Sequence, residues 1–393
     1  MAKDLNVVFA PLRRRDSTVT NAIAAHLQNN SYDRPTLILD VSRVAENFRA
    51  LKAGLGNMNI HYAVKANPAT QVIERLVSEG SRFDAASMGE VSLCLSCGAA
   101  PEDISFGNTV KKPADIAWAF ERGIDLFAAD AEAELVKIAT HAPGARVYIR
   151  MLVEHSQADW PLSRKFGAPA EAVLPLMDFA RAQGLRPVGI SFHVGSQTRR
   201  AAMWGTVLDQ AALVWRDALA AGHDLSVLNI GGGFPTFYGE AIDAPESYGR
   251  TVAQMVRQRF GDVPYIMAEP GRGLVGDAGV ITAEVLLVAT KRETDLARWV
   301  YLDIGKFSGL AETMDEAIRY QFETTADGGE TGPCILAGPS CDSADVLYEQ
   351  RPVQLPLALQ AGDKVLILAC GAYTTSYSSV GFNGFPPLDY VCV

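Results

Sequence analysis

Short apolar runs alternate with amphipathic stretches along most of this chain, and the alternation restricts the possible folds more than any other feature. An apolar run rich in β-branched residues predicts a buried strand, and the amphipathic stretch after it predicts a helix packed on that strand. Roughly eight such strand–helix units follow one another between Thr36 and Glu269. The predicted strands cover residues 36–39, 61–65, 82–84, 104–106, 126–128, 146–151, 189–194 and 227–230, and the apolar run 265–268 ends the series.

This repeat predicts an α/β protein with a (β/α)8 barrel over residues 36–270. A doubly wound open sheet is the competing architecture, but it would concentrate its reactive residues at one switch point. Here candidate reactive residues stand at the ends of several predicted strands, which favours the barrel. After Glu269, strand-like runs follow without long helices between them, which predicts an antiparallel β-sheet domain made of residues 271–393 and 1–35.

Composition restricts the partners of the chain. The 393 residues are 48% hydrophobic and 20% charged, which predicts a globular protein with enough core for two domains. The net charge of −10 argues against nucleic acid, and no apolar run reaches membrane-spanning length. The amino terminus lacks an apolar signal core, and most of the six cysteines lie within apolar runs, as buried thiols of a reduced compartment do. We therefore expect a cytoplasmic protein with no nucleic acid, membrane or metal partner.

Lys65 is the first candidate for catalysis. It stands where an apolar, strand-like run gives way to Asn67-Pro68, and so at the C-terminal mouth of a buried strand. An amine that is partly buried there loses some of its preference for the charged form and becomes the nucleophile that a Schiff-base lysine requires. Most lysines at strand ends simply extend their ammonium groups into water. The catalytic interpretation of Lys65 therefore depends on the segments that follow.

A glycine triplet, Gly231-Gly232-Gly233, comes directly after the predicted strand 227–230. Glycine lets backbone N–H groups approach a phosphate closely, and the loops after the last strands of a barrel are the usual phosphate site. Alone, such a triplet is more often a flexible turn. Gly271 and Arg272, just beyond the run 265–268, add an amide and a guanidinium, so together the segments predict a phosphate-binding site.

Two strand-end residues, Glu269 and His193, are candidates to face a cofactor at this mouth. Glu269 is either a structural salt-bridge partner or a carboxylate that keeps the pyridine nitrogen of pyridoxal phosphate (PLP) protonated. A protonated ring favours a full carbanion, which decarboxylation requires. His193 alone is more often structural, but beside a phosphate loop it is a candidate to stack on the cofactor ring, with Ser196 donating to the phosphate. The predicted cofactor is therefore PLP.

Six motifs then occur in the order seen in fold-type III PLP-dependent decarboxylases. They are Tyr62-Ala63-Val64-Lys65, His193-Val194-Gly195-Ser196, Gly231-Gly232-Gly233-Phe234-Pro235, Glu269-Pro270-Gly271-Arg272, Cys341-Asp342 and Gly371-Ala372-Tyr373-Thr374. From Thr36 to the C-terminus the chain resembles the eukaryotic ornithine decarboxylases and their bacterial lysine/ornithine relatives. This resemblance implies an alanine-racemase-like (β/α)8 barrel with a C-terminal antiparallel β domain, PLP as the cofactor, and a homodimer with shared active sites.

The resemblance also implies roles for individual residues. The catalytic residues would be Lys65, His193, Glu269 and Cys341, of which Cys341 returns a proton to the product. The cofactor-binding residues would be Lys65, Asp84, His193, Ser196, Gly231, Gly232, Gly233, Glu269, Gly271, Arg272 and Tyr373, with Glu90 a further acid near the lysine. The substrate-binding residues would be Asp342, Glu312, Tyr373 and Phe382. Cys341 and Asp342 would reach into the neighbouring subunit's site, where Asp342 holds the distal ammonium of a basic amino acid.

The expected reaction is decarboxylation of L-ornithine to putrescine, and also of L-lysine to cadaverine, in polyamine biosynthesis. The two substrates differ by one methylene, which is worth only about 1–3 kcal/mol in a pocket. Gln197 and the segment 343–347 resemble diaminopimelate decarboxylases, so meso-diaminopimelate remains an alternative substrate. A non-catalytic, antizyme-inhibitor-like homologue is a second alternative, although the cofactor residues are all present. Glu312 is either a second acid near the distal amine or a solvated acid at a helix start.

Overall fold

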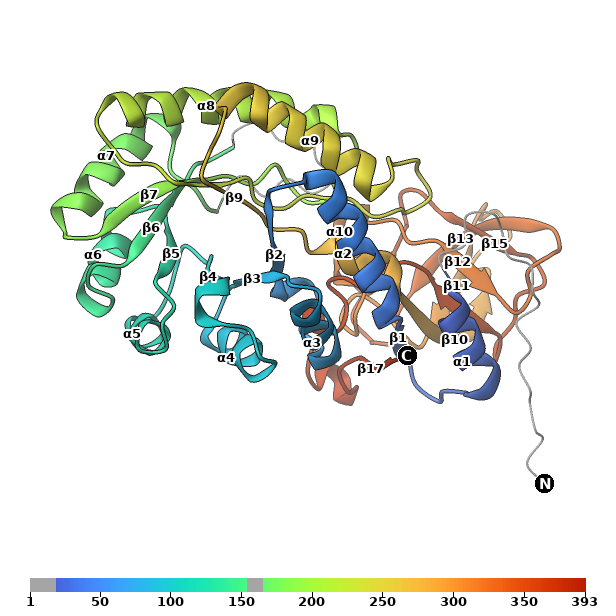
Figure 1. The fold of residues 1–393 in the computed structure, drawn as a ribbon. Coiled ribbons are helices and arrows are strands. Elements are labelled where there is room, and N and C mark those ends of the chain that lie inside the picture. Colours follow the sequence, from blue (N-terminus) through green and yellow to red (C-terminus); the bar gives the residue numbers. More distant parts are fainter. Residues whose placement is uncertain (1–18, 154–164) are drawn as a thin grey trace. The chain divides into compact units, whose positions relative to one another are not determined.

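The computed structural model describes residues 19–153 and 165–393, and it separates into two compact units (Figure 1). The first, here called the barrel unit, comprises residues 44–235 and 242–274. The second, here called the sheet unit, comprises residues 236–241, 275–393 and the segment that ends at Arg43. Of residues 1–35, which we expected in the second domain, residues 1–18 lie outside the described part.

The barrel unit contains a closed barrel of parallel strands, so the predicted (β/α)8 fold is confirmed. The first and last of these strands pair with each other, with Asn59 opposite Met267, and this seam closes the barrel. One buried cluster joins side chains from four strands, namely Leu126, Ala128, Tyr148, Val227 and Met267. In the described residues the barrel strands are β2 (Asn59–Ala63), β3 (Arg82–Ala85), β4 (Ile104–Phe106), β5 (Leu126–Ala129), β6 (Arg146–Arg150), β7 (Arg186–Ser191), β8 (Val227–Asn229) and β9 (Tyr265–Ala268).

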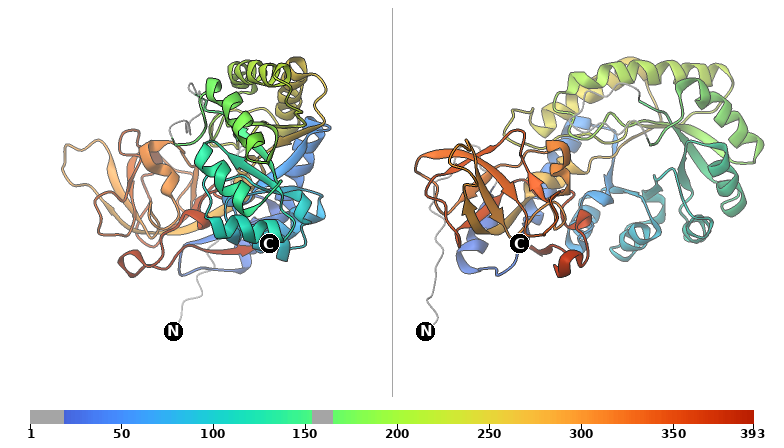
Figure 2. Two further views of the ribbon diagram at one scale, coloured as in Figure 1. Left: turned by 90° about the vertical axis from the view of Figure 1, so that its left-hand side faces the viewer. Right: turned by 180° about the vertical axis from the view of Figure 1, so that it is seen from behind.

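Helices lie outside the barrel strands and follow one another around them (Figures 1 and 2). Each buries one face, as α3 does through Val72, Ile73 and Leu76. Local signals set the helix ends: Ser87 caps α4 by accepting a hydrogen bond from the Glu90 N–H. The helices are α2 (Val41–Leu55), α3 (Thr70–Ser78), α4 (Met88–Ser96), α5 (Pro113–Glu121), α6 (Glu132–His141), α7 (Ala170–Ala182), α8 (Gly205–Ala220) and α9 (Pro245–Phe260), followed by the short α10 (Arg272–Val275).

The sheet unit is built on a nine-stranded sheet within the described residues. Its longest strand, β10, pairs antiparallel with β1, β16 and β11. Most pairs are antiparallel, as predicted, but β1–β17 and β11–β13 are parallel, so the sheet is mixed. The helix α1 (Asn21–Asn29) packs Ile23 against this sheet. The strands are β1 (Thr36–Leu39), β10 (Gly279–Ala289), β11 (Arg298–Leu302), β12 (Phe322–Thr324), β13 (Thr331–Ala337), β14 (Val346–Leu347), β15 (Val353–Pro356), β16 (Lys364–Ile367) and β17 (Asp389–Cys392).

One strand that we predicted in the barrel belongs to the sheet unit instead. We expected residues 36–39 to form the first barrel strand, and this was wrong: as β1 they pair with β10 and β17 in the sheet unit. The barrel is complete without them because Tyr265–Ala268, the run that ended the repeat, supplies its last strand. All four residues of β1 are buried. A strand buried on both faces has the same apolar sequence in either sheet, so the local pattern did not distinguish them.

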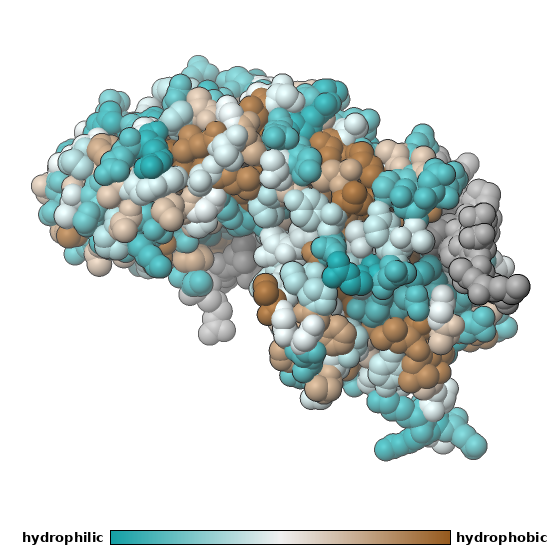
Figure 3. Space-filling view, turned by 90° about the horizontal axis from the view of Figure 1, so that it is seen from below, coloured by the Kyte–Doolittle hydropathy of each residue, from teal (hydrophilic) through white to brown (hydrophobic). Residues whose placement is uncertain are grey.

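The described surface is mixed in polarity. Figure 3 shows one face, on which hydrophilic residues surround separate apolar patches. Among residues 19–153 and 165–393, no helix combines the length and the apolar character that crossing a membrane demands.

Candidate active site

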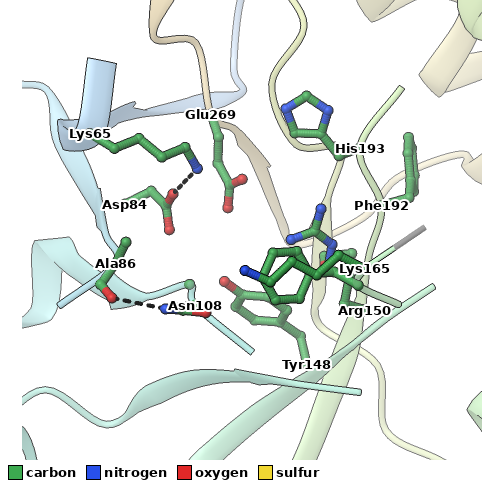
Figure 4. A pocket seen from close by; sticks show the side chains of 13 residues that line it. Lys65, Asp84, Ala86, Asn108, Tyr148, Arg150, Lys165, Phe192, His193 and Glu269 are labelled. Atoms are coloured by element: carbon green, nitrogen blue, oxygen red, sulfur yellow. Dashed lines mark hydrogen bonds and ion pairs between the residues drawn. The ribbon is translucent and has the colours of Figure 1, made fainter. Parts of the chain in front are cut away.

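The carboxyl ends of the barrel strands surround a cavity of about 440 Å³, here called the barrel cavity (Figure 4). This volume lies within the range of small-molecule sites, roughly 300–1,000 Å³. Four of the predicted site residues line it, and each comes from a different strand or from the turn that follows it. They are Lys65 after β2, Asp84 on β3, His193 after β7 and Glu269 after β9.

Lys65 lies in a short 3-10 turn, Val64–Ala66, that follows β2 directly. Two hydrogen bonds hold this turn: Tyr62 Oη donates to the Asn67 carbonyl at 3.0 Å, and the Asn67 N–H donates to the Val64 carbonyl at 3.1 Å. The Lys65 side chain is about half exposed, and its Nζ lies 3.7 Å from Asp84 Oδ2. A rigid turn therefore presents a reachable amine beside a carboxylate.

Asp84 is almost completely buried on β3. A Cβ atom at Gly107, after β4, would overlap Asp84 Oδ1, so only glycine leaves room for the carboxylate there. Burial raises the pKa of Asp84, while the charges of Lys65 and Arg150 oppose that shift. Its Oδ1 has no hydrogen-bond partner among the described residues. A buried oxygen without a partner costs free energy unless a ligand satisfies it.

Glu269 follows β9, and its Oε1 accepts a hydrogen bond from the Asn229 amide at the end of β8. Burial, and after it the negative charge of Asp84, raises the pKa of Glu269 to about 7. The Lys65 charge opposes this rise. In Figure 4 both carboxylates lie toward the Lys65 amine. Glu269 can therefore hold or release a proton near neutral pH.

His193 lies in the loop after β7, and its Nδ1 accepts a hydrogen bond from the Gly195 N–H at 3.0 Å. A neutral ring with that nitrogen as acceptor carries its proton on Nε2. Burial, and after it the nearby charges of Arg150 and Lys65, lowers the pKa of His193 well below its usual range. The site therefore contains a neutral imidazole whose orientation the backbone fixes.

Two of the predicted phosphate ligands, Ser196 and Arg272, lie together. Arg272 is buried at the start of α10, and its Nη2 and Nε lie 3.0 and 3.3 Å from Ser196 Oγ. In the glycine loop after β8, Gly231 and Gly233 have φ values of 70° and 108°. A Cβ atom at Gly232 would lie 2.7 Å from the Glu269 carbonyl and 3.0 Å from His193 Nε2. Side chains at these positions would overlap the neighbouring backbone, so this close packing of the loop requires glycine.

The residues around the barrel cavity fit PLP, the predicted cofactor. The unsatisfied oxygen of Asp84 marks a missing polar partner. The glycine loop packs so closely on its neighbours that a Cβ atom would meet backbone atoms there, and the Gly231 N–H donates to Asn229 Oδ1 at 2.9 Å. Arg272 and Ser196 supply donors suited to a phosphate. Lys65 supplies the amine that an aldehyde requires. The described residues contain no cluster of His, Cys, Asp and Glu side chains suited to a metal ion.

Three predicted residues belong to loops of the sheet unit. Cys341 and Asp342 are exposed between β13 and β14, where Cys341 Sγ donates to Asn383 Oδ1 at 3.7 Å. Phe382 is also exposed, and its ring centroid lies 4.8 Å from that of Phe307. The buried Asp345, which we did not predict as a site residue, accepts hydrogen bonds from the Lys306 N–H and from Ser340 Oγ, both at 2.7 Å. It anchors the loop that carries Cys341.

Glu312 and Tyr373 also lie in the sheet unit. Glu312 is only 6% exposed, in the 3-10 segment Ala311–Glu316, so the alternative that it is a solvated acid was wrong. Tyr373 is half-buried and has a left-handed backbone conformation, with φ of 55°. Such a φ is uncommon for a residue other than glycine and is held by its surroundings. The roles predicted for both residues stay predictions.

The cavity also contains residues that the sequence analysis missed. Tyr148 and Arg150 stand two apart on β6 and therefore face the same side of the strand. Lys165 and Phe166 lie on the same wall, with the Arg150 guanidinium 5.2 Å and Lys165 Nζ 4.8 Å from the Phe166 ring centroid. Tyr148 and Arg150 could have been found from the sequence, because they are polar residues in the otherwise apolar run 146–151. Nothing in the sequence marked Lys165 or Phe166.

Comparisons with known proteins agree with this geometry. Residues 41–276 match the family model described as "Pyridoxal-dependent decarboxylase, pyridoxal binding domain". The chain is 33% identical to the lysine/ornithine decarboxylase of Selenomonas ruminantium, over 89% of this chain and 87% of that protein. It is 32% identical to antizyme inhibitor 2 of Xenopus laevis, over 88% and 78%. The crystal structure of lysine/ornithine decarboxylase from Vibrio vulnificus, complexed with cadaverine, matches 95% of this chain and 97% of that chain, with 31% identity and a TM-score of 0.83.

Proposed function

The chain belongs to the pyridoxal-dependent decarboxylases, and from this premise we propose that it decarboxylates a basic amino acid in polyamine biosynthesis. The proposed reactions are L-ornithine to putrescine and L-lysine to cadaverine. The observation that carries the proposal is the barrel cavity, in which the Lys65 amine lies beside the buried acids Asp84 and Glu269. Relatives named lysine/ornithine decarboxylase support the choice of substrates.

The cofactor of this family is PLP. When bound, PLP supplies an electron-withdrawing ring that takes up the electron pair left at Cα as CO₂ departs. Lys65 would hold its aldehyde carbon, and Glu269 would keep a proton on its ring nitrogen. His193 would pack its neutral ring against the cofactor ring. Its phosphate would be bound by Arg272, Ser196, Tyr373 and the amides of Gly231, Gly232, Gly233 and Gly271.

The environment of each acid suits a different task. Asp84 has one oxygen beside Lys65, so it can orient the amine and balance its charge. Burial, and after it the Asp84 charge, raises the pKa of Glu269 to about 7. A carboxyl poised near neutral pH can share a proton with a ring nitrogen of similar affinity. Two carboxylates close together are thus driven toward different protonation states.

The sheet unit would complete the site of a second subunit. Cys341 and Asp342 are exposed on one loop, where a partner chain can reach them. In the proposed homodimer, Cys341 returns a proton to Cα of the partner's product, and Asp342 holds the distal ammonium. Phe382 would line the space near the departing carboxylate. The buried Glu312 is proposed as a second acid toward the distal amine.

One structural observation keeps a second substrate in consideration. The cations Arg150 and Lys165 on the cavity wall offer partners for an additional carboxylate, which meso-diaminopimelate carries and ornithine lacks. A non-catalytic, antizyme-inhibitor-like role is favoured less, because the residues needed to hold PLP are present in this chain.

The test is CO₂ release from ornithine, lysine, arginine and meso-diaminopimelate, measured side by side with the PLP-loaded protein. We expect kcat/KM to be highest for ornithine or lysine. The variant Asp342→Asn should raise KM for both about tenfold or more, since a desolvated ammonium loses its charge-assisted partner. Asp295→Asn, in an exposed turn of the same unit, is the matched control. A clear preference for meso-diaminopimelate would overturn the diamine proposal, and no release from any substrate would favour the non-catalytic alternative.

A further inference from the structure

Two loops of the barrel unit carry most of the proposed phosphate ligands, and hydrogen bonds join them. The Thr198 N–H donates to the Gly233 carbonyl at 2.9 Å, which links the loop after β7 to the glycine loop after β8. Thr198 Oγ1 also donates to the Gly195 carbonyl at 3.3 Å. Ser196 lies between these two attachments. The position of its hydroxyl therefore depends on how firmly Thr198 is held.

The loop after β7 adopts a conformation that needs support. Gln197, between Ser196 and Thr198, is 2% exposed and has a φ of 60°. A residue with a Cβ atom is disfavoured in this left-handed region and remains there only when the surrounding structure imposes it. Something outside the loop must therefore hold it in place.

Tyr248 on α9 provides such a contact from behind the loop. Its Oη donates to the Thr198 carbonyl at 2.6 Å and accepts a hydrogen bond from Trp204 Nε1 at 2.8 Å. Both rings are buried, and the Phe234 ring lies beside them, with centroid distances of 5.3 Å to Trp204 and 5.9 Å to Tyr248. Burial raises the pKa of the Tyr248 hydroxyl, so it remains a donor throughout the neutral range.

From this arrangement we propose that Tyr248 is a positioning residue for cofactor binding: its hydroxyl holds the loop 195–198 so that Ser196 and the glycine amides face the phosphate. The inference rests on the proposed function, because it assigns the phosphate to these loops. Removal of the hydroxyl leaves the Thr198 carbonyl and the Trp204 N–H buried without their partner. The loop can satisfy its carbonyl again only by moving, and the phosphate ligands move with it.

The experiment compares two ligands of the apoprotein, PLP and pyridoxal, which lacks the phosphate. Tyr248→Phe removes one oxygen and keeps the ring, so the packing with Phe234 is retained. We expect its Kd for PLP to rise about five- to tenfold, the effect of one buried hydrogen bond, while its Kd for pyridoxal changes less than about twofold. Dissociation constants are measured by absorbance titration, and thermal unfolding confirms that each variant is folded.

Two further variants make the result specific. Tyr265 stands at the start of β9, away from the phosphate loops, and its hydroxyl bonds His61 on β2. Tyr265→Phe removes that hydroxyl and should leave the Kd values for PLP and pyridoxal unchanged. Trp204→Phe removes the donor to Tyr248 together with part of a buried ring that packs on Phe234, and it should weaken PLP binding by a smaller factor. This variant also tests the proposal if Tyr248→Phe does not fold.

The outcomes separate the inference from the proposed function. Suppose that wild type binds PLP more tightly than pyridoxal. If Tyr248→Phe leaves both Kd values unchanged, or raises both by the same factor, the positioning role is overturned while the phosphate site stands. If wild type binds pyridoxal as tightly as PLP, the phosphate assignment itself fails. The proposal is supported if Tyr248→Phe loses affinity for PLP but not for pyridoxal. The loss should be smaller in Trp204→Phe and absent in Tyr265→Phe.

Discussion

At the scale of single residues, the barrel cavity places two acids beside one lysine. Asp84 takes the closer position, 3.7 Å from the Lys65 amine. Glu269 accepts a hydrogen bond from the Asn229 amide, and the negative charge of Asp84 repels its ionised form. The charge of Glu269 is therefore set by what binds next to it, and a protonated ring nitrogen would favour its ionised form.

The first prediction concerns Glu269→Gln. The variant should keep PLP, because the phosphate ligands and Lys65 are unchanged, but decarboxylation should slow about 100-fold, since a neutral amide cannot keep the ring nitrogen protonated. Single-turnover CO₂ release measures this step apart from product release. Glu246→Gln, which alters an exposed pair with Arg250, is the control. An unchanged single-turnover rate would exclude the proposed role of Glu269.

At the scale of elements, the seam between β2 and β9 closes the barrel and carries a buried histidine. His61 on β2 is 2% exposed, and its Nε2 lies 2.9 Å from Tyr265 Oη on β9, which also bonds Arg82. Burial, and then the charge of Arg82, lowers the pKa of His61 to about 3. The folded protein therefore keeps this ring neutral at pH values where the unfolded chain would protonate it.

The second prediction follows from that difference. The stabilisation associated with His61 is complete above the unfolded pKa, about 6.5, and is lost progressively as the pH falls toward about 3. Across this window, one proton taken up on unfolding lowers the free energy of unfolding by about 1.4 kcal/mol per pH unit. Urea unfolding of the apoprotein between pH 7.5 and 5 should show a shallower pH dependence for His61→Gln than for wild type. His141→Gln is the control, and equal slopes in all three proteins would contradict the prediction.

A second element-scale contact joins the loop after β4 to α6. Lys111 Nζ is buried 2.9 Å from Glu134 Oε1, and it donates to the carbonyls of Asn108 and Ala128 at 2.7 Å each. Burial lowers the pKa of Lys111 to about 8, against the opposing charge of Glu134. Asn108 lines the barrel cavity, so this pair supports one of its walls.

The third prediction is a double-mutant cycle on this pair. Glu134→Leu alone should lower the free energy of unfolding by about 3 kcal/mol, because it leaves a buried ammonium without its carboxylate. Lys111→Met combined with Glu134→Leu should cost less than the sum of the two single changes. The exposed pair Glu246 and Arg250 should show almost no coupling in the same urea experiment. Additive costs at Lys111 and Glu134 would show that the pair is not coupled.

At the scale of the whole molecule, we proposed an active site that two chains share. The described barrel cavity contains the lysine, whereas the proposed proton donor Cys341 lies in the sheet unit. If each sheet unit completes the site of a partner, two inactive variants can together form an active site.

The fourth prediction uses Lys65→Ala and Cys341→Ala, mixed under conditions where subunits exchange. About half of the dimers should contain one chain of each kind. In such a dimer one site has both defects, and the other has an intact Lys65 and an intact Cys341. One functional site in two, across half of the dimers, should restore about a quarter of wild-type diamine formation. No recovery after demonstrated exchange would overturn the shared site and with it the proposed need for a dimer.

The barrel, and the edge at which its reactive residues stand, could be predicted from the order of the residues alone. Side-chain periodicity and strand order are local properties, so the alternating runs could be read directly. Lys65, His193 and Glu269 could be expected in one place because the carboxyl ends of parallel strands meet at one mouth of a barrel. Asp84 was expected there only from the resemblance to known decarboxylases. Tyr148 and Arg150 were missed for a different reason, since β6 was read only for its apolar character.

Features that depend on partners distant in the sequence became clear only from the packed fold. The pairing of Thr36–Leu39 with β10 and β17 is one, because a fully buried strand has the same sequence in a barrel and in a mixed sheet. The burial of Glu312 is another, since a helix-start acid is exposed or enclosed according to the elements that pack over it. The contact of Tyr248 with Thr198 spans 50 residues. Such contacts are set by packing between elements, which no local pattern of residues encodes.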